Sequence, residues 1–233
     1  MTLHIGIKSL LIGAAALIGL PATMVAAQNW NAEYRADGDG HAVGNPEAVV
    51  KLITFVSYTC PHCASFEIES DSALRAAYIH EGKVAVEVRH TIRNPIDLAA
   101  ALITQCGPKE KFFDNHRRIL FAQSTWLPKA RQASEAQRMR WSSGPAPARM
   151  RAIAADLGFY NLMETRGYSR ANLDRCLGDT VRAEAIATLS EHNAEAFGVR
   201  GTPSFAINGQ LLEGVHNWAD LQPAINAALT TGE

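Results

Sequence analysis

Cys60 and Cys63, two cysteines separated by Pro61 and His62, are the residues whose types and spacing could do chemistry. A cysteine reacts as its thiolate, so the groups that stabilise the thiolate decide what the pair can do. His62 could stabilise it through its charge or by donating a hydrogen bond. We therefore predict a redox-active pair in which the pKa of Cys60 is lowered and a substrate thiolate attacks the Cys60–Cys63 disulfide at Cys60.

The segments on either side of the pair place Cys60 at the start of a helix. The preceding residues 52–56 are rich in β-branched and aromatic side chains and predict a buried strand, whereas the apolar residues from Phe66 to Tyr78 recur at helical spacing. Proline is favoured in the first turn of a helix, where Pro61 stands. Unpaired backbone N–H groups and the helix dipole favour an anion there, and we expect that anion to be the thiolate of Cys60.

Two other interpretations of the cysteine pair are weaker. A zinc half-site needs two further ligands, and neither Cys106 nor Cys176 has a Cys or His neighbour at ligand spacing. A purely structural disulfide would close a very tight ring at a helix start. We expect no metal and no cofactor other than the cysteine pair itself. A peptide-binding, chaperone-like module in which the pair is incidental remains an alternative from a different class.

The first 27 residues have the layout of a signal peptide. Lys8 precedes the apolar run 10–18, and small residues at 25–27 suit cleavage after Ala27. The run is too short to span a membrane, although a retained membrane anchor is the alternative. Both a cleaved signal peptide and a retained membrane anchor predict that the chain is exported from the cytoplasm.

The remaining sequence predicts one catalytic domain interrupted by helices. A strand at 48–57, a helix reaching about His80 and a strand at 83–89 predict a right-handed parallel crossover. The pattern then stays helical until a final strand at 204–207, the hairpin signal Asn208-Gly209 and a closing helix at 218–229. The expected organisation is a flexible N-terminal arm (28–40), a first part of the domain (41–95), a helical insertion (96–198) and a second part (199–233).

Composition narrows the class further. The formal net charge is −1 with acids and bases mixed along the chain, which argues against nucleic-acid recognition. An even number of cysteines, 4, in an exported chain allows two pairs, so we expect Cys106 and Cys176 to form a structural disulfide. Two buried free thiols, or a second redox pair, are the alternatives.

The order of strand, Cys-Pro-His-Cys, helix, helical stretch and Thr202-Pro203 entering a strand resembles the DsbA family of bacterial periplasmic thiol-disulfide oxidoreductases. The resemblance covers nearly all of the chain after residue 27. It implies an α/β, thioredoxin-like fold with an inserted helical subdomain. It also implies a periplasmic dithiol oxidase that acts on unfolded or partly folded exported proteins with free thiols and is reoxidised by a DsbB-like membrane partner.

The same resemblance assigns roles to single residues. Cys60 would be the exposed nucleophile and Cys63 the buried resolving thiol. The bond between Thr202 and Pro203 would be cis and face the pair, so that the backbone of Thr202 could bind an extended substrate. The hydroxyl of Thr202 could also hydrogen-bond Cys60 and tune its thiolate.

One residue departs from the family pattern, and the direction of the redox reaction is open. Thr54 stands six residues before Cys60, where family members often carry a buried glutamate, so the proton path at Cys63 is open. A disulfide isomerase or reductase with the same cysteines is the close rival. Related isomerases are dimers built through an added N-terminal domain, and the short arm here favours an oxidase and a monomer.

The remaining candidate residues are expected to be solvent-exposed or structural. Glu67 and Glu69 could tune the site, but a solvated helix face is the expectation for both. Trp126 and Trp141 are expected to serve packing. No metal-ligand spacing relates the other histidines, which we expect to be surface or structural residues: His41, His80, His90, His116, His192 and His216.

Overall fold

The computed structural model describes residues 1–2, 28–36 and 38–232. The expected signal peptide therefore lies almost wholly outside the described residues. Within the described ranges, the structure contains no helix that is both long enough and apolar enough to cross a membrane.

A mixed six-stranded sheet, with strand order β1-β2-β4-β3-β5-β6, forms the centre of the domain. β3 and β4 are parallel, as the strand–helix–strand pattern predicts, and β5 joins β3 in antiparallel orientation. β3 thus lies inside the sheet, and Cys60 follows it after a short loop. The strands are β1 (Tyr34–Arg35), β2 (His41–Val43), β3 (Val50–Val56), β4 (Val84–His90), β5 (Ser204–Ile207) and β6 (Gln210–Leu211).

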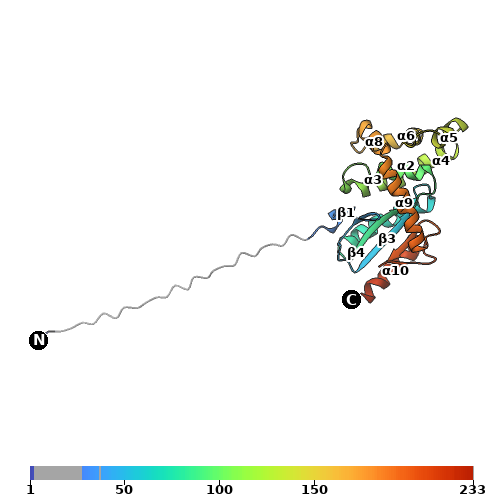
Figure 1. The fold of residues 1–233 in the computed structure, drawn as a ribbon. Coiled ribbons are helices and arrows are strands. Elements are labelled where there is room, and N and C mark those ends of the chain that lie inside the picture. Colours follow the sequence, from blue (N-terminus) through green and yellow to red (C-terminus); the bar gives the residue numbers. More distant parts are fainter. Residues whose placement is uncertain (3–27, 37, 233) are drawn as a thin grey trace.

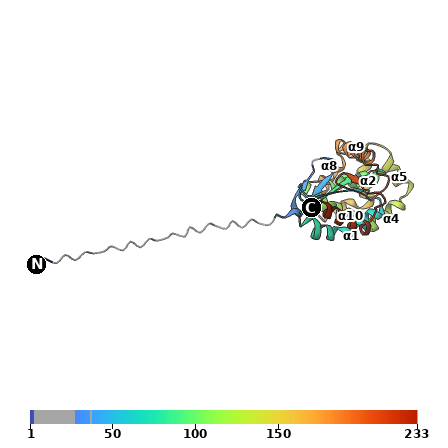
Figure 2. The ribbon, with the colours of Figure 1, turned by 90° about the horizontal axis from the view of Figure 1, so that it is seen from below.

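Helices cover both faces of this sheet. In Figure 2, α1 and α10 lie on one side of the molecule and α9 on the other. Alternation along β3 explains the two layers, because Leu52 and Val56 join the main core while Ile53 and Phe55 pack with Phe197 at the end of α9. The helices of the two layers are α1 (Pro61–Ala73), which continues as the π-helix η2 (Leu74–Ile79), α9 (Thr180–Phe197) and α10 (Trp218–Thr231).

The chain between β4 and β5 is helical, and most of these helices gather at one end of the molecule (Figure 1). Trp126 and Trp141 are buried there, which confirms their packing role. Pro128 and Pro145 interrupt the helical pattern of this stretch, so the bounds of α4 and α5 could not be set from the sequence. The elements are α2 (Pro95–Thr104), the 3-10 turn η3 (Lys109–Lys111), α3 (Phe112–Phe121), α4 (Gln123–Arg131), α5 (Glu135–Ser142), α6 (Ala146–Leu157), α7 (Phe159–Glu164) and α8 (Arg170–Leu177).

Cys106 and Cys176 form the expected disulfide, which spans a sequence separation of 70 residues. Cys106 is buried just beyond the end of α2, and Cys176 lies in the last turn of α8. The bridge therefore links α8 to the loop that follows α2.

Residues 28–36, within the stretch 28–40 that the sequence predicts to be a flexible arm, contain regular structure. The 3-10 turn η1 (Trp30–Ala32) and strand β1 form there, and β1 pairs with β2 in antiparallel register. Trp30 packs against the main core. Two and three residues are too few for a strand pattern to be recognised, which explains why β1 and β2 were missed.

The Asn208-Gly209 hairpin is present as expected. Both residues have positive φ, 51° and 84°, as a two-residue turn of this kind requires. The Asn208 side chain accepts a hydrogen bond from the backbone N–H of Lys51 at 2.8 Å, which ties the turn to β3.

Candidate active site

Cys60 is the N-cap of α1, and Pro61 occupies its first turn, as the sequence predicts. The backbone N–H of Cys63 points to the carbonyl of Cys60 at 3.2 Å, so the first turn closes over the pair. Both cysteines are free in this structure, which therefore represents the reduced dithiol state. Pro61 and His62 are exposed on the surface beside them.

Cys60 is less accessible than the resemblance implied. It is 4% exposed and Cys63 is 0% exposed. The reason is the loop before β5, since the thiol of Cys60 donates a hydrogen bond to the carbonyl of Thr202 at 3.1 Å. The Thr202 backbone therefore covers part of the Cys60 sulfur.

The Thr202–Pro203 peptide bond is cis, and it lies against Cys60 as expected. Two further contacts hold this loop. Ser204 donates its hydroxyl to the carbonyl of Gly201 at 2.9 Å, and Nδ1 of His216 donates to the carbonyl of Pro203 at 2.8 Å. His216 thus has a structural role, which is one of the two roles expected for it.

The pKa values of the two thiols are shifted in opposite directions. A hydrogen bond from the Cys63 thiol lowers the pKa of Cys60 to about 5, against burial, which raises it; the Thr202 hydroxyl and the backbone N–H groups of Cys63 and His62 lower it further. Burial, followed by the proximity of Cys60, raises the pKa of Cys63 well above its ordinary value. Cys60 is consequently a thiolate at neutral pH while Cys63 keeps its proton.

His62 stabilises the thiolate through its backbone N–H group rather than through the imidazole that the sequence suggested. The Thr202 hydroxyl makes no hydrogen bond within the described residues while Cys60 is a thiol, although its oxygen is buried. It is therefore free to donate to the thiolate once the proton has left.

A titration of the reduced protein tests this arrangement. We expect thiolate absorbance in the ultraviolet to rise with a midpoint near pH 5, and Thr202→Val to move the midpoint upward by about one pH unit because a donor to the thiolate is lost. A lowered pKa stabilises the folded reduced protein above the pKa of the unfolded thiol, and this stabilisation is lost as pH falls through about 5.

Thr188→Val, at an exposed position of α9, is the matched control and should leave the midpoint unchanged. An unshifted midpoint in Thr202→Val would show that the hydroxyl does not reach the thiolate.

Asp97 organises the loop that leads to Cys60, and sequence reasoning missed it. Its fully buried carboxylate accepts hydrogen bonds from the Ser57 hydroxyl at 2.9 Å and from the Thr59 N–H at 2.8 Å. Burial raises the pKa of Asp97, while these hydrogen bonds oppose the shift. Asn94 caps α2 and also donates to the Thr59 hydroxyl at 3.0 Å. The Asn94-Pro95 helix start was a usable signal for this segment.

Gln123 reaches the same loop from α4. Its buried side-chain amide donates to the carbonyls of Tyr58 at 2.7 Å and Cys60 at 2.9 Å. The helices between β4 and β5 thus hold the backbone of the cysteine loop directly. No local sequence signal marks this contact.

A small cavity of about 30 Å³ lies between β3 and α1. Thr54 lines it, and so do Glu67 and Ser70 from α1. The space can hold a water molecule. Glu67 is not a solvated helix-face residue as expected, because its carboxylate is 13% exposed and lies 3.5 Å from Nε2 of buried His116. A carboxylate from α1 therefore reaches the cavity in which Thr54 of β3 offers only a hydroxyl.

Comparison with known proteins places this geometry in a family. The family model described as Thioredoxin matches residues 36–227. A solved protein-disulfide isomerase from Novosphingobium aromaticivorans is 46% identical, with a TM-score of 0.79, and the match covers 82% of this chain and 97% of that one. Wolbachia pipientis alpha-DsbA1 shares the fold at 17% identity, with a TM-score of 0.66 over 82% of this chain and 91% of its own.

A curated relative from Rickettsia typhi carries the name protein-disulfide oxidoreductase and is 27% identical over 197 residues. These residues cover 84% of this chain but only 64% of that relative's length. The expected α/β architecture, with helices inserted into a thioredoxin-like sheet, is confirmed by the family match and the solved structures. The chain belongs to the thioredoxin family and has the fold of its DsbA-type proteins.

Proposed function

We propose that this protein is a thiol:disulfide oxidoreductase that introduces disulfides into exported proteins through Cys60 and Cys63. The observation that carries the proposal is the unequal acidity of the two thiols at the start of α1. A stable Cys60 thiolate lowers the free energy of the reduced dithiol, and so makes the disulfide form a stronger oxidant. The cysteine pair is the only redox group that this proposal requires.

The exchange conserves atoms and electrons. A substrate thiolate attacks Sγ of Cys60, a mixed disulfide forms, and the Cys60–Cys63 bond breaks to release Cys63, which takes up a proton because its pKa is high. A second substrate thiolate then attacks the substrate sulfur and releases Cys60 as a thiolate. The substrate has lost two electrons to the cysteine pair, and a membrane oxidase of the DsbB type would remove them.

Thr202 supports this cycle at both stages. When reduced Cys60 carries its proton, below about pH 5, the carbonyl of Thr202 accepts the hydrogen bond of the thiol. In the thiolate, the disulfide and the mixed disulfide Cys60 has no proton to donate, so the carbonyl becomes available to a backbone N–H of an extended substrate. The Thr202 carbonyl lies 3.1 Å from the reacting sulfur.

The periplasm is the proposed compartment, and a monomer is the proposed state. The signal-peptide layout of residues 1–27 supports export, and the Cys106–Cys176 disulfide suits an oxidising environment. The proposed substrates are unfolded or partly folded exported proteins that carry free thiols.

Disulfide isomerisation is the second candidate. The 46% identical relative from Novosphingobium is described as a protein-disulfide isomerase, and a low pKa at Cys60 serves an attacking thiolate as well as a leaving one. Oxidation of a substrate requires the Cys60–Cys63 disulfide, whereas isomerisation requires the reduced pair.

Parallel refolding assays distinguish the two candidates. The oxidised protein is mixed with a reduced, unfolded ribonuclease, and the reduced protein with a ribonuclease whose disulfides are scrambled. An oxidase consumes substrate thiols stoichiometrically in the first assay and recovers little activity in the second. Fast recovery of the scrambled enzyme, with slow thiol consumption in the first assay, would reject the oxidase proposal in favour of isomerisation.

A further inference from the structure

A second cavity, of about 370 Å³, lies between the start of β2, the end of β4, the loop after α2 and helix α9. Its volume falls within the range of roughly 300–1,000 Å³ that is usual for small-molecule sites. None of Cys60, Cys63 and Thr202 lines it. The proposed redox chemistry therefore makes no use of this space.

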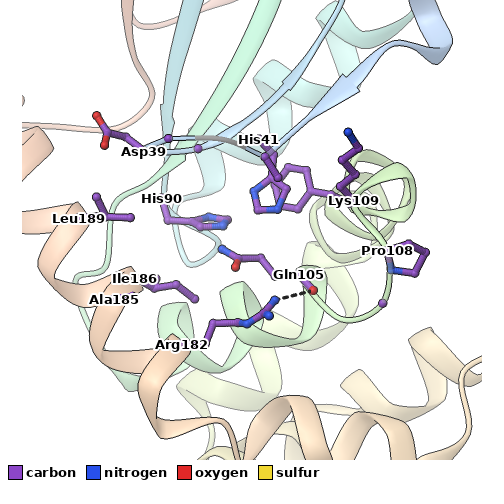
Figure 3. Close-up of a pocket in the computed structure, with 15 residues that line it drawn as sticks. Asp39, His41, His90, Gln105, Pro108, Lys109, Arg182, Ala185, Ile186 and Leu189 are labelled. Atoms are coloured by element: carbon purple, nitrogen blue, oxygen red, sulfur yellow. Dashed lines mark hydrogen bonds between the residues drawn. The ribbon is translucent and has the colours of Figure 1, made fainter.

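Two histidines, the half-buried His41 and the buried His90, line this cavity from neighbouring strands (Figure 3). His90 is 8% exposed, and neither of its ring nitrogens has a hydrogen-bond partner among the described residues. Nδ1 of His41 is buried and also lacks a partner in the described part of the chain. Buried polar atoms are almost always hydrogen-bonded, so these ring nitrogens are polar groups of the cavity wall whose hydrogen bonding the described residues do not satisfy.

Cationic groups face the same space. The guanidinium of Arg182 donates to the carbonyl of Gln105 at 3.2 Å and has further N–H donors, and Lys109 also lines the cavity. Asp179 lies 3.5 Å from Nε of Arg182 but does not line the cavity. Arginine binds carboxylates well because its planar fork matches their two oxygens.

The acidic side chain that lines the cavity is turned away from its middle. Figure 3 shows the carboxylate of Asp39 directed outward, and it lies 2.8 Å from Nη1 of Arg89. Burial, the proximity of His116 and then Arg182 lower the pKa of His41 to about 4, and burial with the two neighbouring histidines lowers the pKa of His90. Both rings are neutral at pH 7, and the surroundings oppose added positive charge.

Apolar side chains form one part of the remaining lining, beside the polar side chain of Gln105. Phe112 stacks on His41 with ring centroids 3.8 Å apart, and Ala185, Ile186 and Leu189 of α9 form the opposite wall. A ligand must therefore combine an anionic group with an apolar body. We propose that this cavity binds a small organic carboxylate, held by Arg182 and the two histidines, with its apolar part against Ile186 and Leu189.

Benzoate is a suitable probe, with benzyl alcohol, inorganic phosphate and Zn²⁺ as comparisons. Each is titrated into the full oxidised protein by calorimetry, and the ring resonances of His41 and His90 are followed by NMR. We expect benzoate to saturate a single site and shift both histidines, and benzyl alcohol and phosphate to bind at least about tenfold more weakly.

Two variants separate this site from general surface binding. Arg182→Gln should weaken benzoate binding by about tenfold or more, whereas Arg138→Gln, the same change at an exposed position of α5, should leave it unchanged. Ala185→Trp fills the cavity from its rim and should abolish binding without a change of charge. The proposal is overturned if benzoate fails to saturate below about 10 mM, or if Arg182→Gln or Ala185→Trp binds benzoate as the unaltered protein does. It is also overturned if Zn²⁺ or phosphate binds the site more tightly than benzoate.

Discussion

Replacing Cys60 by serine is expected to abolish disulfide exchange, with a loss of at least about 1,000-fold. In the proposed exchange Cys60 is the thiolate that leaves when the substrate disulfide forms. A serine hydroxyl can neither form the mixed disulfide nor leave as a stable anion at neutral pH. The rate of thiol consumption in the ribonuclease assay measures the loss.

Cys63→Ser is the matched control, since it removes the other sulfur of the pair and keeps the thiolate. It should lose turnover. Its Cys60 thiolate should attack the disulfides of scrambled ribonuclease, release one substrate thiolate and accumulate as a mixed disulfide, visible as bands that disappear under reducing conditions. Full activity in Cys60→Ser would instead support the chaperone-like alternative, in which the pair is incidental.

Removing the Cys106–Cys176 bridge is expected to lower the free energy of unfolding by up to about 4 kcal/mol. A cross-link over 70 residues restricts the unfolded chain strongly, and this accounts for the size of the effect in the chain-entropy model. Equilibrium denaturation of the Cys106→Ser, Cys176→Ser double variant, compared with the unaltered protein under oxidising conditions, measures it.

The same variant separates a structural bridge from a second redox pair. Its exchange activity should match that of the unaltered protein at a temperature where both are folded. A loss of activity without a loss of stability would mean that Cys106 and Cys176 take part in electron transfer. For the free energy of unfolding, the unaltered protein in a strong reductant provides a control in which the sequence is unchanged. It does not serve the exchange assay, because the reductant also reduces Cys60–Cys63.

The cysteine pair was the part of the site that the sequence determined most directly. A buried strand, a short loop and a proline in the first helical turn are local features, and they place Cys60 at the N-cap of α1. The contact between Cys60 and Thr202 joins residues 142 positions apart and followed only from the resemblance to a known family. The low exposure of Cys60 could not be foreseen from either source.

The supporting residues were missed because tertiary packing alone brings them together. Asp97 is an ordinary first-turn residue of α2 in the sequence, yet folding buries it under the cysteine loop. Gln123 lies on a helix that contains Pro128, and helix patterns are hard to recognise across a proline. His41, His90 and His116 come from β2, β4 and α3, so no spacing along the chain relates them.

The central claim is that the protein oxidises substrates because its reduced pair is stabilised, and equilibration in glutathione buffers of graded potential tests it most directly. The fraction of reduced Cys60–Cys63 is measured by alkylation and mass, with the Cys106–Cys176 bridge intact. A Cys60 pKa near 5 predicts a potential more oxidising than about −200 mV, towards the value of about −120 mV known for DsbA. A potential near that of thioredoxin, about −270 mV, would contradict the claim.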